Sequence, residues 1–194
     1  MTWAPEMEAL LNEPALTWAL RVFLALLFVT AGLSKLQNLE EFYGVVRNFR
    51  LLPDGPSRAV AFTLPVVEIA VAVGLLVSSV AVPAAVAAAL LLAGFAAAIA
   101  INVLRGRTYI DCGCMRQGMK QPISWLLVAR NLALTGLALT IAVLLPAVRP
   151  AGIADLFVGL SAGGTAMMLY LSASLLGGVM ATQTSTLAAK GRRA

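Results

Sequence analysis

The chain has 194 residues, of which 60% are hydrophobic and 12% charged, with a formal net charge of +5 and a mean hydropathy of +0.90. Soluble domains carry about 25% charged residues, so the solvent of so apolar a chain must be lipid. The chain has no histidine, which excludes His-ligated haem, most zinc sites and imidazole acid–base chemistry. The basic residues are scattered near helix ends, as in lipid-anchored proteins, so the net charge gives little support to nucleic-acid binding.

Apolar stretches long enough to cross a bilayer, which takes about 20 residues, recur along the chain. They cover roughly residues 16–36, 58–79, 81–104, 124–146 and 155–180. The residues before the first stretch carry glutamates but no lysine or arginine, unlike a signal peptide, so we expect a permanent anchor. We therefore predict an all-α integral membrane protein. Its parts are an N-terminal tail (1–15), a four-span unit (16–150), a fifth span (151–183) and a basic tail (184–194).

An amphipathic helix is predicted between the first two spans. Within residues 37–49, apolar side chains recur at helical spacing (Leu39, Phe42, Tyr43, Val46 and Phe49). Such a helix lies in the membrane interface, and the turn residues of "LLPDGP" then end it. Two spans separate this connection from the loop at 105–123, so both connections lie on the same side and the helix can cover that loop.

Polar side chains occur inside the predicted spans. Glu68 lies near the middle of the second span, where a charge costs about 2.5–3.5 kcal/mol on insertion scales, so its side chain should face the bundle interior. Arg21 and Arg130 are candidate counter-ions, with Asn131 and Asn102 nearby in the polar set. An ion pair that fixes helix register and a functional group explain Glu68 equally well.

Small residues indicate close helix packing in two places. The third span is dominated by alanine, and the fifth contains Gly159-x-x-x-Gly163. Such residues let membrane helices approach closely. The glycine face can dock on the chain's own bundle or on a partner's membrane helix, and we favour the chain's own bundle.

The only two cysteines, Cys112 and Cys114, lie one residue apart in the third connection, "YIDCGCMRQ". A disulfide across so short a ring is strained and readily reduced, and it removes little chain entropy as a staple. Two cysteines cannot fill a tetrahedral metal site alone. The pattern favours a redox-active pair over two inert thiols.

The neighbours of the pair favour reactivity. Nearby cations stabilise the thiolate, the reacting species; here they are Arg105, Arg107, Arg116 and Lys120. Asp111 opposes this effect for Cys112 but could shuttle a proton, and Gly113 permits a sharp turn between the sulfurs.

A dithiol that cycles must exchange two electrons with something, and the chain has no second cysteine pair. The other redox partner is therefore external, either a second protein with its own cysteines or a quinone in the bilayer. The intramembrane polar residues and Trp125 are places where a quinone headgroup could bind.

Three elements together resemble the MauE branch of the MauE/DoxX family of membrane proteins. They are Gly32-x-x-Lys35-Leu36, Pro65-x-x-Glu68 and Cys112-Gly113-Cys114. The resemblance covers roughly residues 16–146, with the fifth span as an added helix. It implies a four-helix redox bundle similar in plan to vitamin K epoxide reductase and DsbB. It also implies a catalytic role for the cysteine pair, while Lys35 and Glu68 are family positions without an assigned role.

The resemblance further implies a task in the bacterial inner membrane. The expected partner is the thioredoxin-like protein MauD, and the expected end substrate is the disulfide-rich, periplasmic small subunit of methylamine dehydrogenase. The chain would then be a component of a thiol–disulfide oxidoreductase, with a quinone as a possible electron acceptor. Two alternatives are a non-catalytic scaffold that anchors MauD and, more weakly, a small-molecule transporter.

The distribution of basic residues and the family's expected task predict opposite sides of the membrane for the cysteine loop. The connections after the first and third spans and the tail hold nearly all the basic residues, whereas the opposite side has only Arg149. The positive-inside rule therefore predicts a cytoplasmic loop. Disulfides persist in oxidising compartments, and the family's task is periplasmic, so we predict a periplasmic loop.

Overall fold

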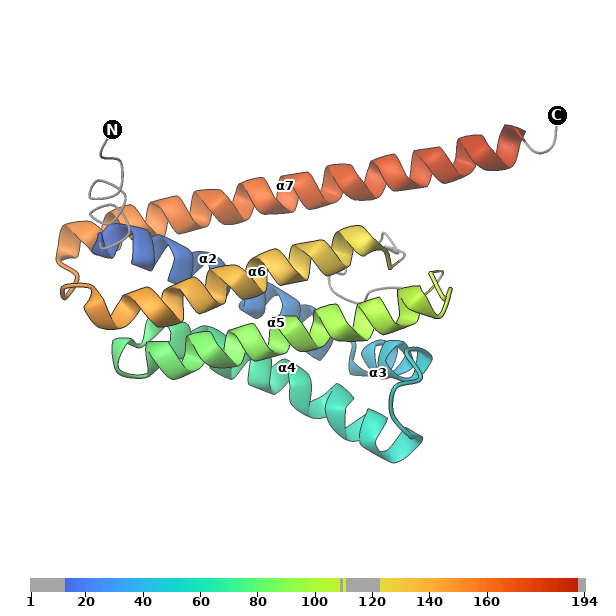
Figure 1. Cartoon of the computed structure of the whole chain (residues 1–194), viewed down its shortest axis with the longest axis horizontal. Coiled ribbons are helices and arrows are strands. Elements are labelled where there is room, and N and C mark those ends of the chain that lie inside the picture. Colours follow the sequence, from blue (N-terminus) through green and yellow to red (C-terminus); the bar gives the residue numbers. More distant parts are fainter. Residues whose placement is uncertain (1–12, 109, 111–122, 192–194) are drawn as a thin grey trace.

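The computed structural model describes residues 13–108, 110 and 123–191, with side chains described as far as residue 175. All regular structure in these ranges is helical (Figure 1). The helices are α2 (Pro14–Leu36), α3 (Leu39–Asn48), α4 (Asp54–Leu76), α5 (Ala81–Leu104), α6 (Trp125–Leu144) and α7 (Ile153–Gly191). Short 3-10 turns, η1 (Ser78–Val80) and η2 (Leu145–Ala147), join α4 to α5 and follow α6.

Among the described residues, five helices are long and apolar enough to cross a membrane, which confirms a multi-pass membrane protein. The predicted amphipathic helix is also present, as α3. Helix α4 begins at Asp54, four residues before the approximate start predicted for the second span. Its first turn contains Pro56. Proline is tolerated there because the first N–H groups of a helix have no intrahelical partner. "DGP" is therefore a helix start and not a turn.

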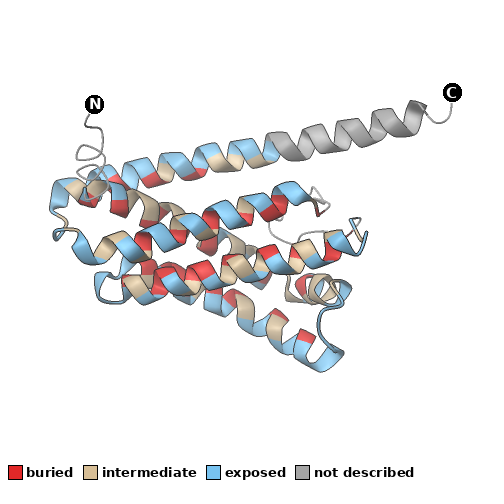
Figure 2. Cartoon of the chain, viewed as in Figure 1, coloured by how far each residue is buried: buried red, intermediate tan, exposed pale blue. Residues whose placement is uncertain are grey.

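The apolar core lies where α2 meets its neighbours. Helix α2 packs on α4 and α7, while α5 packs on α6 and α4. The fully buried side chains include Leu24 and Phe28 of α2 and Leu75 of α4. The alanines of α5 face this core and let neighbouring helices approach, as predicted. Figure 2 shows the buried residues on the inward faces of these helices.

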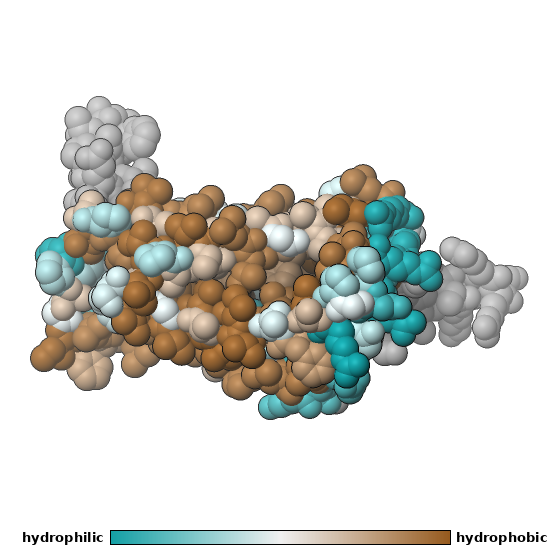
Figure 3. Space-filling view, turned by 90° about the horizontal axis from the view of Figure 1, so that it is seen from below, coloured by the Kyte–Doolittle hydropathy of each residue, from teal (hydrophilic) through white to brown (hydrophobic). Residues whose placement is uncertain are grey.

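The outer surface of the helices is strongly apolar. Leu90, Leu126, Val143 and Phe157 are each more than two-thirds exposed. In Figure 3 the hydrophobic surface covers the middle of the molecule, and hydrophilic residues gather mainly toward one end. An exposed belt of this kind is compatible with lipid and not with water.

The glycine face of α7 packs on α2 of the same chain, so the expected own-bundle docking is confirmed. A Cβ added to Gly159 would lie 2.5 Å from Cβ of Trp18. A Cβ added to Gly163 would lie 2.6 Å from the carbonyl oxygen of Ala19 and 2.8 Å from Cβ of Val22. Only glycine fits at either position.

Replacement of Gly163 by leucine should destabilise the fold by about 1–3 kcal/mol or more, because the side chain must push α7 away from α2. Gly164→Leu is the matched control, since a Cβ at Gly164 meets nothing within 4 Å. The measurement is the midpoint of thermal unfolding of each full-length variant in detergent. Equal midpoints for the two variants would contradict the observed packing of α7.

Candidate functional site

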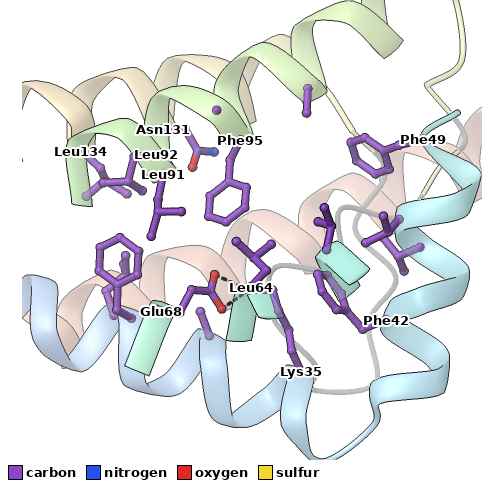
Figure 4. A pocket seen from close by; sticks show the side chains of 18 of the residues that line it. Lys35, Phe42, Phe49, Leu64, Glu68, Leu91, Leu92, Phe95, Asn131 and Leu134 are labelled. Atoms are coloured by element: carbon purple, nitrogen blue, oxygen red, sulfur yellow. Dashed lines mark hydrogen bonds and ion pairs between the residues drawn. The ribbon is translucent and has the colours of Figure 1, made fainter. Parts of the chain in front are cut away.

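A cavity of about 350 Å³ lies among the helices. Its walls come from α2, α3, α4, α5 and α6, with Tyr170 contributed by α7. Figure 4 shows its leucine and phenylalanine side chains surrounding a few polar groups. The polar or charged residues among the described lining, apart from Tyr170, are Thr30, Lys35, Glu68, Arg130 and Asn131. The cavity is therefore an apolar chamber with a small polar interior, as is usual for small-molecule sites.

Lys35 and Glu68 form a buried ion pair in the wall of this cavity. The Lys35 ammonium donates to both carboxylate oxygens, at 2.6 and 2.8 Å, and the side chains are only 7% and 1% exposed. The ammonium also lies 5.4 Å from the ring centre of Phe42 and 5.5 Å from that of Phe95. Each charge is thus compensated within the protein.

The counter-ion of Glu68 is therefore Lys35, and the expectation of Arg21 or Arg130 in that role was wrong. The reason is how α2 and α4 meet. A Cβ on Gly32 would lie 2.9 Å from Cδ1 of Ile69 and 3.1 Å from the Pro65 carbonyl oxygen. The glycine thus brings the helices together about one turn from the ion pair.

Gly32 and Lys35 are three residues apart, as are Pro65 and Glu68, so both members of each pair share a helix face. The two motifs therefore form one contact between α2 and α4. The equal spacing of the two motifs in the sequence is the signal from which the pairing of Lys35 with Glu68 could have been predicted.

Arg130 and Asn131 line the cavity from α6. The Nε atom of Arg130 is buried and has no hydrogen-bond partner among the described residues. Its guanidinium carbon lies 5.9 Å from the ring centre of Tyr170. The side-chain amide of Asn131 donates to the carbonyl oxygen of Leu127 at 2.8 Å. Arg130 thus brings to the cavity a donor that the described residues do not satisfy.

Two other polar residues of the predicted intramembrane set lie outside the cavity lining. Arg21 Nε donates to the carbonyl oxygen of Leu75 at 2.6 Å, near the end of α4, and its guanidinium stacks over Trp18. A cation at that position complements the negative end of the helix. Asn102 accepts a hydrogen bond from Arg107 at 3.1 Å. Of the predicted intramembrane polar residues, Arg21 and Asn102 therefore have structural roles, and the others line the cavity.

The predicted cysteine site, Cys112 and Cys114 with Asp111, Gly113, Arg116 and Lys120, lies outside the described residues. The residues on either side of this segment are described. The backbone N–H of Ile123 donates to the carbonyl oxygen of Ile110 at 3.1 Å, and both isoleucines are buried. They pack with Ile99, Leu127 and Phe49. The two ends of the cysteine loop are thus held together in an apolar cluster.

Arg105 and Arg107 fasten the start of the same connection to the end of α3. Arg107 donates to the carbonyl oxygens of Asn48 at 2.8 Å and Phe49 at 3.4 Å, and Arg105 donates to that of Arg50 at 3.4 Å. The last carbonyls of a helix have no internal partner, so cations satisfy them well. An effect of these arginines on the thiols stays a prediction.

Phe49 connects the loop base to the cavity, because it packs in the Ile110–Ile123 cluster and also lines the cavity. The predicted approach of the amphipathic helix to the cysteine loop is therefore present at the loop's base. Trp125, the other suggested headgroup contact, is 54% exposed and is not part of the cavity lining.

The sequence matches the family "Methylamine utilisation protein MauE" over residues 13–145. The methylamine utilization protein MauE of Paracoccus denitrificans is 68% identical over 96% of this chain and 100% of its own length. The MauE proteins of Paracoccus versutus and Methylorubrum extorquens are 62% and 50% identical, over 96% and 94% of this chain and 100% and 98% of their own lengths. No solved structure matches. The chain belongs to the MauE family.

Proposed function

We propose that this protein is a membrane thiol–disulfide redox protein of methylamine utilisation. Its Cys112 and Cys114 exchange electrons with a MauD-like thioredoxin-fold partner during maturation of the methylamine dehydrogenase small subunit. The names of its relatives support the pathway. The observation that carries the redox role is the closed base of the cysteine loop, Ile110 bonded to Ile123, next to an intramembrane cavity.

Exchange proceeds through a mixed disulfide. A thiolate of the partner attacks one sulfur of the Cys112–Cys114 disulfide, and the other sulfur leaves as a thiolate. The partner's second thiolate then displaces the first sulfur, so the partner is oxidised and the pair in this chain becomes a dithiol. The reverse sequence reduces the partner by the same steps.

We further propose that the cysteine loop faces the periplasm from the bacterial inner membrane. The charge count that opposes this placement includes Lys35, yet Lys35 lies within α2, buried and paired with Glu68. The proposed redox unit is α2, α4, α5 and α6, on a plan like that of vitamin K epoxide reductase and DsbB, with α7 packed on α2.

Trapping the mixed disulfide tests the proposal. In cells with Cys112→Ser or Cys114→Ser, the remaining thiolate should attack the disulfide of the oxidised partner and form a reducible covalent adduct, which persists because this chain has no second thiol to displace the partner. The adduct is detected on a non-reducing gel with an antibody against a tag on either protein. The double serine variant is the control and should give no adduct.

The same assay reports the side of the membrane. A thiol reagent that does not cross the inner membrane, added before trapping, should prevent the adduct. An adduct that forms despite the reagent would place the loop in the cytoplasm. Absence of any adduct from both single variants would contradict the exchange mechanism.

A non-catalytic scaffold is the second candidate, and the length of α7 favours it. This helix has 39 residues, Ile153–Gly191, whereas about 20 residues are enough to cross a bilayer. Its far end extends beyond the other helices at the end of the molecule where the cysteine loop begins (Figure 1). A long helix at this end of the molecule offers a surface on which a partner could be held without thiol chemistry.

A further inference from the structure

Among the described residues that line the cavity, one cationic group has no anionic partner. Lys35 and Glu68 compensate each other, which leaves Arg130 as the remaining charged one among the described lining residues. Its buried Nε lacks a partner among the described residues. The rest of the lining is almost entirely apolar. The chemistry of the cavity therefore matches a molecule with an apolar body and a hydrogen-bond acceptor.

The cavity opens sideways, among the membrane-spanning helices. Two of its lining residues on α5, Leu90 and Gly94, are exposed, as is Leu52 before α4. Helices α4 and α5 adjoin at their η1 hairpin and diverge toward the other end, where α3 lies beside α4 (Figure 1). Because the exposed faces of both helices are apolar, this opening leads to lipid and not to water.

We propose that this cavity binds the headgroup of a membrane quinone, with Arg130 donating to a quinone carbonyl and the tail leaving between α4 and α5. The inference rests on the proposed redox function, because a dithiol that becomes a disulfide must release two electrons. The quinone accepts these two electrons and two protons and becomes a quinol, while the two thiols become a disulfide.

Two observations favour a quinone over an anionic phospholipid. A volume of about 350 Å³ is at the small end of ligand pockets, which span about 300–1,000 Å³, and suits one ring better than a two-chain lipid. The cavity also shares Phe49 with the base of the cysteine loop, so the headgroup site and the base of that loop lie at the same end of the bundle. A phospholipid could not accept the electrons.

Filling the cavity provides the test. Gly94 lines the cavity and a Cβ there meets nothing within 4 Å, so a leucine starts without a clash at its Cβ and can extend into the ligand space. Gly136→Leu is the matched control, because Gly136 is an exposed helical glycine with equal room outside the cavity. Binding of a short-tailed ubiquinone to each full-length variant in detergent is measured by equilibrium titration.

Gly94→Leu should weaken quinone binding by about tenfold or more, equal to at least 1.4 kcal/mol at 25 °C, while Gly136→Leu should bind like the unaltered protein. Arg130→Gln should weaken binding to a similar degree, because it removes the charged donor. Equal binding by the two leucine variants would overturn the proposal. The proposal would also be overturned if the unaltered protein bound phosphatidylglycerol but not quinone, and if Gly94→Leu lost that lipid binding.

A variant without the two cysteines distinguishes the quinone site from the proposed thiol–disulfide exchange. The double variant Cys112→Ser/Cys114→Ser should still bind quinone, since the cavity is formed by other residues, but it should not convert quinone to quinol when a thiol reductant supplies electrons. Mixed-disulfide trapping without quinone binding would retain the redox function and refute the quinone site. Quinone binding without trapping would retain the quinone site and refute the thiol–disulfide exchange.

Discussion

Replacement of Lys35 by methionine is expected to destabilise the folded protein by about 3–5 kcal/mol, because it leaves the Glu68 carboxylate without its partner in an apolar bundle. The side chains of the pair are 7% and 1% exposed, so water cannot replace the lost interaction. The measurement is unfolding of the full-length variant in detergent, followed by circular dichroism.

An exposed ion pair provides the control for this variant. Nε of Arg47 lies 3.3 Å from Oδ1 of Asp54, and the two side chains are 64% and 75% exposed. Arg47→Met should cost at most about 1 kcal/mol, since exposed pairs contribute little. If Lys35→Met were as mild as Arg47→Met, the buried pair would not be a structural element.

The combined variant Lys35→Met/Glu68→Leu separates structure from function. Replacing both partners of a buried pair by apolar residues is often neutral or stabilising, by about 1–4 kcal/mol, so stability should return. Because the fold is then intact, maturation of methylamine dehydrogenase in cells reports any chemical role. Normal maturation would assign the pair to helix register, and loss of maturation would assign it a function.

The spans and the amphipathic helix could be predicted from the sequence because both depend on local properties. Runs of apolar residues determine where α5 and α6 cross the bilayer, and the helical spacing of Phe42, Val46 and Phe49 predicts α3. The start of α4 was not predicted correctly because a proline usually ends a helix and is tolerated only in its first turn.

The partner of Glu68 and the cavity depend on how helices cross, which no single segment determines. The contact of Gly32 with Ile69 and Pro65 sets the register that brings Lys35 to Glu68. The cavity exists because α4 diverges from α5 while α3 turns its apolar face inward. The sequence predicted that this face would lie in the interface, but its residues Phe42, Val46 and Phe49 line the cavity.

Replacement of both cysteines by serine is expected to reduce maturation of the methylamine dehydrogenase small subunit to the level of a strain that lacks the protein. Serine preserves size and polarity but cannot form a disulfide, and neither can alanine, so serine and alanine double variants should fail equally. A difference between them would indicate a packing role for the thiols. The readouts are dehydrogenase activity and the amount of small subunit, with immunoblots confirming that each variant remains in the membrane. Full maturation in the serine variant would exclude the redox mechanism and leave the scaffold, because the partner would then need only the surface that surrounds the cysteine loop.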